Sequence, residues 1–423
     1  MEAVTPQKRS KLTLYILGAM VAGMLVGIIV NKNATPEWGK AFATNVKLLS
    51  TIFLRLVQMV IAPLVFTTLV VGIAKLGDMK TVGRVGGKAI LWFVSASLVS
   101  LLLGMLLVNI FQPGRYIDLS QADTEGLKDL MTKNQGFSIQ NFVEHVIPKS
   151  LIEAMANNEI LQLVIFSVFF GVATAALGDF AKPLVKALDI AAHVILKVVT
   201  YVMNFAPIGV FGALAAVVAV KGLGIFNFYI IYFAYFLVGI ACLWVVLLTV
   251  GYIILGKRMP ELLRRISNPL LIAFGTTSSE AVFPKLTEEL ERFGCKDKIV
   301  SFVLPLGYSF NLDGSMMYMT FASLAIAQAY NIPLDVPTQL TMLLVLMLTS
   351  KGIAGVPRAS LVVVLATCAM FNIPPEGVAL ILPIDHFCDM FRTMTNVVGN
   401  ALATSVVSKW EGELTGADVV KVG

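Results

Sequence analysis

Near the end of the chain, four polar residues have the types and the spacing of a binding site on one helical face. They follow one another at intervals of four, three and four residues, and they are Asp385, Asp389, Arg392 and Asn396. A helix places residues at such intervals on the same side. Read as one helix with its apolar flanks, the stretch can cross a bilayer, where a charge costs roughly 2.5–3.5 kcal/mol and usually lines a polar pathway. The alternative is burial in a soluble core, and composition decides between them.

The composition is that of a membrane protein. Of the 423 residues, 57% are hydrophobic and only 14% are charged, whereas soluble domains carry about 25% charged residues. Apolar runs of membrane-spanning length recur from residues 12–30 onward, which predicts a polytopic integral membrane protein in a lipid bilayer. The first run is too long for a signal peptide and lacks a small-residue cleavage site, so we expect a retained helix.

The distribution of charge predicts the topology. The net charge is +6, and basic clusters lie before the first span, between the second and third spans, and at 257–265. Because basic residues favour the cytoplasmic side, we expect a multi-pass protein of the cell (inner) membrane with both termini in the cytoplasm. A basic chain of this kind is not expected to bind nucleic acid. Four cysteines without CxxC spacing and three scattered histidines predict no disulfide, metal cluster or cofactor.

The hydrophobic pattern predicts an all-α fold. Six ordinary spans are expected in the first part of the chain, at about 12–30, 45–74, 87–110, 159–178, 188–219 and 225–256. We interpret the amphiphilic stretch 112–148 as an extracellular surface loop without chemistry.

The second half of the chain has a different pattern. Residues 268–292 contain an apolar approach, a Thr/Ser-rich tip and an amphipathic return, which indicates a re-entrant hairpin. The span 299–331 is interrupted by polar residues at 309–315, and 340–366 repeats the hairpin pattern. Two corresponding interrupted segments are typical of inverted repeats around a midplane binding site. This pattern predicts a secondary transporter and does not identify its substrate.

Two other classes compete with a transporter. Paired intramembrane aspartates suggest an aspartyl protease, but such catalysis needs a proton shared between the carboxylates. Arg392 beside Asp385 and Asp389 favours both as anions, so we expect no enzyme. A channel is harder to separate from a carrier, and the re-entrant hairpins together with a substrate-like polar cluster favour a carrier.

Several short motifs resemble those of the dicarboxylate/amino acid:cation symporter family, which includes the excitatory amino acid transporters and archaeal aspartate transporters. The resemblance covers nearly the whole chain, and the bacterial proton-coupled glutamate/aspartate symporters are most similar in these motifs. The motifs are Thr277-Ser278-Ser279, Asn311-Leu312-Asp313-Gly314, Ala354-Gly355-Val356-Pro357, and Asp389-Met390-Phe391-Arg392-Thr393 followed by Asn396.

The resemblance implies about eight transmembrane helices, two re-entrant helical hairpins, inverted repeats and an elevator mechanism in a homotrimer. It assigns 1–86 (helices 1–2) and 159–222 (helices 4–5) to a fixed scaffold. It assigns 87–158 (helix 3 and the extracellular loop) and 223–412 (helix 6, both hairpins, broken helix 7 and helix 8) to a mobile transport domain. Residues 413–423 form a cytoplasmic tail, and the second hairpin acts as a gate.

The chemistry of Arg392 calls for a small anionic substrate, because a guanidinium binds a carboxylate through two hydrogen bonds and stays charged. The resemblance implies that Arg392 binds the substrate's side-chain carboxylate and that Asp389 binds its amino group. Asp389 therefore favours glutamate or aspartate over succinate or malate. The alternative is that Asp389 and Arg392 only neutralise each other. The other implied substrate contacts are Ser278, Ser279, Ser315, Val356, Thr393 and Asn396.

The residues at the expected cation sites differ from those of sodium-coupled family members. Asn400 stands where sodium-coupled members have an aspartate, and Phe93 and Ala96 stand where they have a tyrosine and a threonine. Glu280 and Lys351 instead place ionisable groups at the hairpin tips, which predicts proton coupling carried by Glu280. Two alternatives stay open: a Glu280–Lys351 salt bridge between the tips, and a sodium-coupled glutamate/aspartate or C4-dicarboxylate symporter. The residual cation-site positions are Ser97, Gly307, Asn311, Asp313 and Asn400.

Overall fold

The computed structural model describes residues 11–76, 79–117, 143–144, 146–222, 225–350 and 359–415. Within these ranges the regular structure is helical, apart from one isolated bridge between Cys295 and Leu414. The prediction of an all-α chain is confirmed. Most of the stretch predicted as an extracellular loop lies outside the described residues.

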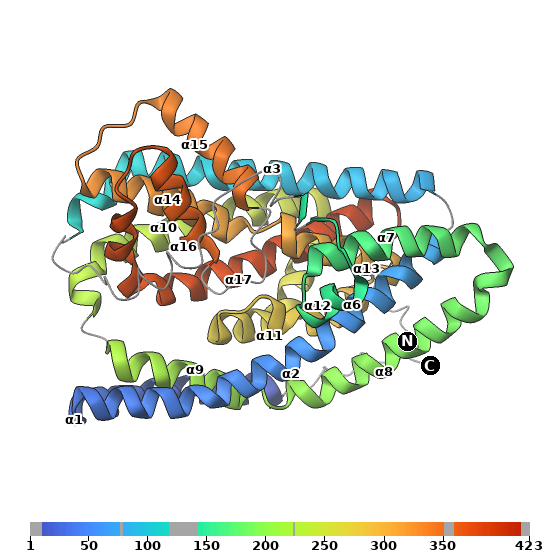
Figure 1. The fold of residues 1–423 in the computed structure, drawn as a ribbon, viewed down its shortest axis with the longest axis horizontal. Coiled ribbons are helices and arrows are strands. Elements are labelled where there is room, and N and C mark those ends of the chain that lie inside the picture. Colours follow the sequence, from blue (N-terminus) through green and yellow to red (C-terminus); the bar gives the residue numbers. More distant parts are fainter. Residues whose placement is uncertain are drawn as a thin grey trace.

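The first half consists mainly of long helices (Figure 1). They are α1 (Lys11–Asn33), α2 (Pro36–Leu76), α3 (Met79–Phe111), α6 (Leu151–Ala156), α7 (Ile160–Ala176), α8 (Lys182–Met203), α9 (Ala206–Lys221) and α10 (Ile225–Leu255), with short 3-10 turns η1 (Pro113–Tyr116) and η3 (Gly178–Ala181). The span predicted at 188–219 falls on α8 and α9, which meet at a bend of 49°. Pro207 lies in the first turn of α9. Proline there lacks the N–H that a continuous helix needs, so the helix restarts.

The second half contains the interrupted elements. They are η4 (Gly256–Arg258), α11 (Met259–Thr276), η5 (Glu280–Val282), α12 (Phe283–Phe293), α13 (Asp297–Phe310), α14 (Asp313–Ala329), α15 (Val336–Thr349), α16 (Ala359–Met370), η7 (Pro375–Gly377) and α17 (Val378–Trp410). The predicted first hairpin is present as α11 and α12, with residues 277–279 outside any helix. The predicted break falls at Asn311 and Leu312. The tip of the second hairpin, 351–358, lies outside the described residues.

The helices pack in two groups that meet along the molecule. In one group α2 contacts α7, α8 and α9, and α1 lies along α9; in the other, α17 contacts α10, α11, α13 and α14, and α3 lies along α14 (Figure 1). The groups touch where α2 meets α13 and where α9 meets α11. The division into scaffold and transport domain, and an elevator motion between them, stay predictions.

Several helices are apolar enough for a membrane. Among the described residues, four helices pass the criteria of length and composition for a span, or five if the bent α8–α9 pair is one span. Large apolar side chains such as Leu14, Leu91 and Ile253 are more than half exposed, as expected for a lipid-facing surface. The structure fits a multi-pass membrane transporter. The count of about eight spans and the inverted repeats stay predictions.

Candidate functional site

Helix α17 presents the polar residues singled out in the sequence to one cavity. The cavity has a volume of about 810 Å³, and Asp385, Asp389, Arg392, Thr393 and Asn396 all line it. Except for Asp389, which is 20% exposed at its side chain, these residues are buried. The one-face prediction for this helix is confirmed.

Arg392 lies between two carboxylates. Its Nη1 donates to Oδ1 of Asp385 at 2.9 Å, and its Nε donates to Oδ1 of Asp389 at 2.7 Å. Its guanidinium also lies over the ring of Tyr318, 4.5 Å from the centroid, which is a cation–π contact. Nη2 makes no hydrogen bond to any described residue. The two carboxylates therefore hold the guanidinium in place, while its Nη2 still has N–H donors for a ligand.

The two carboxylates differ in their surroundings. Oδ1 of Asp385 accepts bonds from Arg392 and from the hydroxyl of Tyr318, which lies 2.9 Å away, and the side chain is only 1% exposed. Asp389 accepts from Arg392 and, at 3.1 Å, from Thr393, both at Oδ1. Its Oδ2 has no hydrogen-bond partner in the described part of the chain. Oδ2 of Asp385 also has no hydrogen-bond partner among the described residues. The two carboxylates thus differ mainly in exposure: Asp385 is buried against Tyr318, and Asp389 keeps a partly exposed acceptor at the cavity.

The tip of the first hairpin forms a second wall. Helix α11 ends at Thr276. The next residue, Thr277, caps it with a left-handed φ of 51°, a conformation that is costly for a β-branched residue. Ser278, Ser279 and Glu280 follow and line the cavity. The Ser278 hydroxyl accepts a bond from the N–H of Ala281 at 3.2 Å, which shapes the turn.

The broken helix supplies the third wall. Ser315, in the first turn of α14, bonds twice to Asn396: its N–H donates to Oδ1 at 3.2 Å, and its hydroxyl accepts from Nδ2 at 3.0 Å. Gly314 makes this approach possible, because a methyl group there would collide with the backbone of Arg392. The N-terminal turn of α14 therefore lies against the binding face of α17.

The five residual cation-site positions gather beside this wall. Ser97 Oγ donates to the carbonyl of Phe310 at 3.4 Å, and Asn311 Nδ2 donates to Asp313 Oδ2 at 3.1 Å. In the amide orientation that satisfies its neighbours, Asn400 Nδ2 lies 3.2 Å from the carbonyls of Gly307 and Asn311. The neutral amide N–H₂ of Asn400 therefore faces the carbonyl oxygens of Gly307 and Asn311, which could otherwise coordinate a cation. No group of metal-ligating carboxylate, histidine or cysteine side chains occurs among the described residues.

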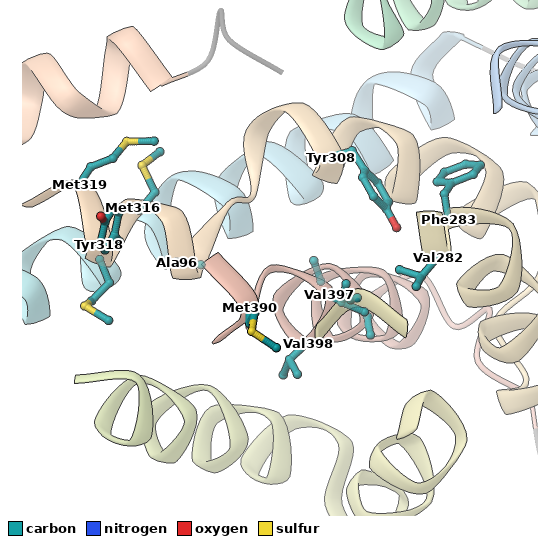
Figure 2. Packing of buried hydrophobic residues seen from close by; sticks show 14 of the residues in the cluster. Ala96, Val282, Phe283, Tyr308, Met316, Tyr318, Met319, Met390, Val397 and Val398 are labelled. Carbon is teal, nitrogen blue, oxygen red and sulfur yellow. The ribbon is translucent and has the colours of Figure 1, made fainter. Parts of the chain in front are cut away.

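Aromatic residues hold the walls together. Tyr308 of α13 lies beside Phe283 of the first hairpin, with ring centroids 5.2 Å apart, and Figure 2 shows this pair with Val282 next to it. Trp244 of α10 donates its indole N–H to the Thr395 hydroxyl at 2.9 Å. Thr395 directly precedes Asn396, so this bond fastens α10 to the turn of α17 that carries part of the binding face.

The structure brings together most of the predicted site and adds residues that the sequence analysis missed. Val356 and Lys351 lie outside the described residues, so a Glu280–Lys351 pair stays a prediction. Tyr318 was missed because its contact to Asp385 joins helices 67 residues apart. The cavity also extends to α2 and α9, where Lys40 and Lys47 line it. Their spacing of seven residues on one helical face was the available signal.

Comparisons with known proteins agree on the family. The model of the "Sodium:dicarboxylate symporter family" matches residues 12–410. A C4-dicarboxylate transport protein of Citrifermentans bemidjiense is 41% identical, over 96% of this chain and 92% of the relative. Proteins of the same name from Rhodospirillum rubrum and Bacillus subtilis are 42% and 38% identical, over 97% of this chain in both cases and 91% and 96% of the relatives. These relatives are named as transporters and not as enzymes. This chain belongs to the sodium:dicarboxylate symporter family.

Proposed function

We propose that this chain is a cation-coupled symporter for four-carbon dicarboxylates, including aspartate, their amino-substituted form. The observation that carries the proposal is Nη2 of Arg392, which has no hydrogen-bond partner among the described residues and lies in a cavity that is also lined by serine and threonine hydroxyls and the Asn396 amide. A guanidinium fork is suited to a planar carboxylate. Because Arg392 is 2% exposed, its bond to a substrate would be shielded from water.

The second carboxylate of the substrate would bind between the first hairpin and the start of α14. Ser278 and Ser279 supply hydroxyls there, and Leu312 and Ser315 at the start of α14 line the same region. The N-terminal end of a helix favours an anion. Two anion-binding regions in one cavity support a substrate with two carboxylates.

Asp389 would let the site distinguish acidic amino acids from dicarboxylates that lack an amino group. Its unused Oδ2 would accept the ammonium group of aspartate or glutamate, which supports the expectation drawn from the sequence. The relatives' printed name instead supports C4-dicarboxylates such as succinate and malate. Aspartate satisfies both lines of argument, because it has four carbons, two carboxylates and an amine. We place it first, with succinate and malate next and the longer glutamate after them.

The coupling ion is proposed to be a proton. Glu280 lines the substrate cavity, and the Asn400 amide faces carbonyls where a sodium site needs a ligand or a negative charge. Sodium is the second candidate, since the family's printed description names it. The buried Oδ1 of Asn311 also has no hydrogen-bond partner in the described residues, which favours a cation nearby. A homotrimer, an elevator motion and insertion in the inner membrane with cytoplasmic termini complete the proposal.

Uptake by purified protein in liposomes tests this function. Labelled aspartate, succinate and glutamate are supplied while a proton gradient and a sodium gradient are imposed separately. We expect saturable uptake and counterflow of aspartate and succinate, driven by the proton gradient without sodium. If uptake requires sodium and does not respond to the proton gradient, sodium is the coupling ion and the proposal of a proton is wrong. Absence of uptake of all three compounds under either gradient would refute the dicarboxylate proposal.

A further inference from the structure

The substrate cavity has a basic rim that is separate from its binding face. Lys40 and Lys47 lie on the face of α2 that lines the cavity, seven residues apart, with Thr44 between them on the same face. Both lysine side chains are exposed, and neither has an ion-pair partner among the described residues. They are the lysines in the described lining of this cavity.

The position of the two lysines is also unexpected on the predicted topology. The N-terminus and the basic clusters are placed in the cytoplasm, so α1 crosses outward and α2 begins on the outer side. Basic residues avoid that side on average. Two lysines at the outer end of α2, without an ion-pair partner in the described part of the chain, therefore need a reason other than topology.

The charges inside the cavity supply that reason. Its described lining carries three carboxylates, from Glu280, Asp385 and Asp389, against one buried cation, Arg392. A cavity with this excess of negative charge repels a dianion before the short-range bonds to Arg392 can form. Lys40 and Lys47 bring the formal charge of the lining to neutrality. His386, which also lines the cavity, adds a positive charge only when protonated.

We propose that Lys40 and Lys47 form an electrostatic vestibule that draws dicarboxylates toward Arg392 without contacting the bound substrate. The inference rests on the proposed function, because it concerns the entry of the same anions to the same cavity. Charged clefts raise the rate of association of an oppositely charged ligand by about 10- to 1,000-fold, and salt weakens the effect. The two lysines act before binding, whereas Arg392 acts in the bound state.

The test replaces both lysines and varies substrate charge and salt. In Lys40→Gln/Lys47→Gln, KM for succinate should rise about three- to tenfold at an ionic strength of about 0.01 M, where the Debye length is about 30 Å, with Vmax unchanged. The increase should be smaller for aspartate, whose net charge is −1 and not −2. It should disappear at about 1 M ionic strength, where the Debye length is about 3 Å. Lys40→Arg/Lys47→Arg should keep the wild-type KM.

Lys32→Gln is the matched control. Lys32 is an exposed lysine in the last turn of α1, predicted to lie on the same side of the membrane, and it does not line the cavity. If the double glutamine variant behaves like Lys32→Gln, or if its KM rises equally for succinate and aspartate at every salt concentration, the vestibule is refuted while the proposed function stands. If the wild-type protein transports neither compound, the proposed function itself fails.

Discussion

Helix α17 has two clusters of ionised side chains, one around Arg392 and one just beyond its end at Glu411 and Glu413. In the first, the arginine is buried, and one edge of its guanidinium is not used by the described residues. In the second, Glu411 binds Arg84 and Lys88 of α3, and Glu413 binds Lys296 and Lys298 beside α13. Each carboxylate there has two basic partners, and those partners reach water: Arg84 is 52% exposed, although the Glu411 side chain itself is only 4% exposed.

The difference shows how the surroundings of an ion pair determine what it can do. A buried charge with unused donors binds a ligand strongly, because no water competes for those donors. Where a carboxylate is already paired and its basic partners reach water, the pair can only hold elements together, and each such pair contributes roughly 0–1 kcal/mol. The same types of side chain therefore indicate ligand binding around Arg392 and, at Glu411 and Glu413, attachment of the segment after α17 to α3 and α13.

Removal of Arg392 should have the largest effect. Arg392→Ala leaves Asp385 and Asp389 without their cation and removes the substrate's partner, at a cost on the order of 3–5 kcal/mol, or a hundredfold or more in affinity. Uptake of succinate and aspartate should both be abolished. Arg84→Ala, at the exposed cluster, is the control and should retain uptake. Near-normal substrate affinity in Arg392→Ala would exclude Arg392 from the site.

Asp389→Ser should separate the substrates. A charge-assisted hydrogen bond contributes about 1.5–3 kcal/mol, so aspartate affinity should fall roughly 10- to 100-fold. Succinate has no amine to lose, and its affinity should change little or improve. Competition binding with both compounds measures the ratio. Equal losses for succinate and aspartate would contradict the assignment of Asp389 to the amine and support a purely structural pair with Arg392.

Glu280→Gln should uncouple transport from the proton gradient while sparing exchange of substrate for substrate. One coupled proton supplies about 1.4 kcal/mol per pH unit, so accumulation should fall about tenfold for each unit of imposed gradient. Glu376→Gln, a change in the short turn before α17, is the control. If Glu280→Gln still accumulates substrate with the wild-type response to pH, another carboxylate carries the proton, with Asp313 or Asp385 next.

The exposed cluster should show the smallest effect and a defined pH dependence. Burial would raise the pKa of Glu411, but its bonds to Arg84 and Lys88 and their charges lower it below the ordinary 4.5. The carboxylate therefore contributes stability above pH 4.5 that is lost as pH falls through its lower folded pKa. Glu411→Gln should lower the free energy of unfolding in detergent by about 1 kcal/mol or less at neutral pH. The difference should vanish at acidic pH, and a constant difference at all pH values would contradict this account.

Much of the interrupted half could be predicted from sequence, because the signals are local. Asn311 and its neighbours favour unwound backbone, and the break lies there. The Thr/Ser tip before Glu280 was placed correctly for the same reason. In the first half, Pro207 marks the restart of the helix at α9, a local signal that the periodicity of the surrounding apolar residues concealed.

The contacts that complete the site could not be predicted in this way. Tyr318 reaches Asp385 across two helices, and Gly314 matters only because α17 lies against it. Such pairs depend on tertiary packing, which no local pattern encodes. The sequence shows Lys40 and Lys47 in α2, but it does not show that they line a cavity, because that cavity is formed with helices more than 200 residues later in the chain.

The hydrogen bond from Trp244 to Thr395 gives this protein a natural optical probe. Indole emission depends on the hydrogen bond that the N–H makes and on the polarity around the ring, and this N–H bonds to the residue next to Asn396. Of the other three tryptophans, Trp92 and Trp410 contact each other near the C-terminal end of α17, and Trp38 lies at the start of α2. With those three changed to phenylalanine, the fluorescence of Trp244 alone would follow the arrival and departure of substrate in real time, without a label and without a membrane.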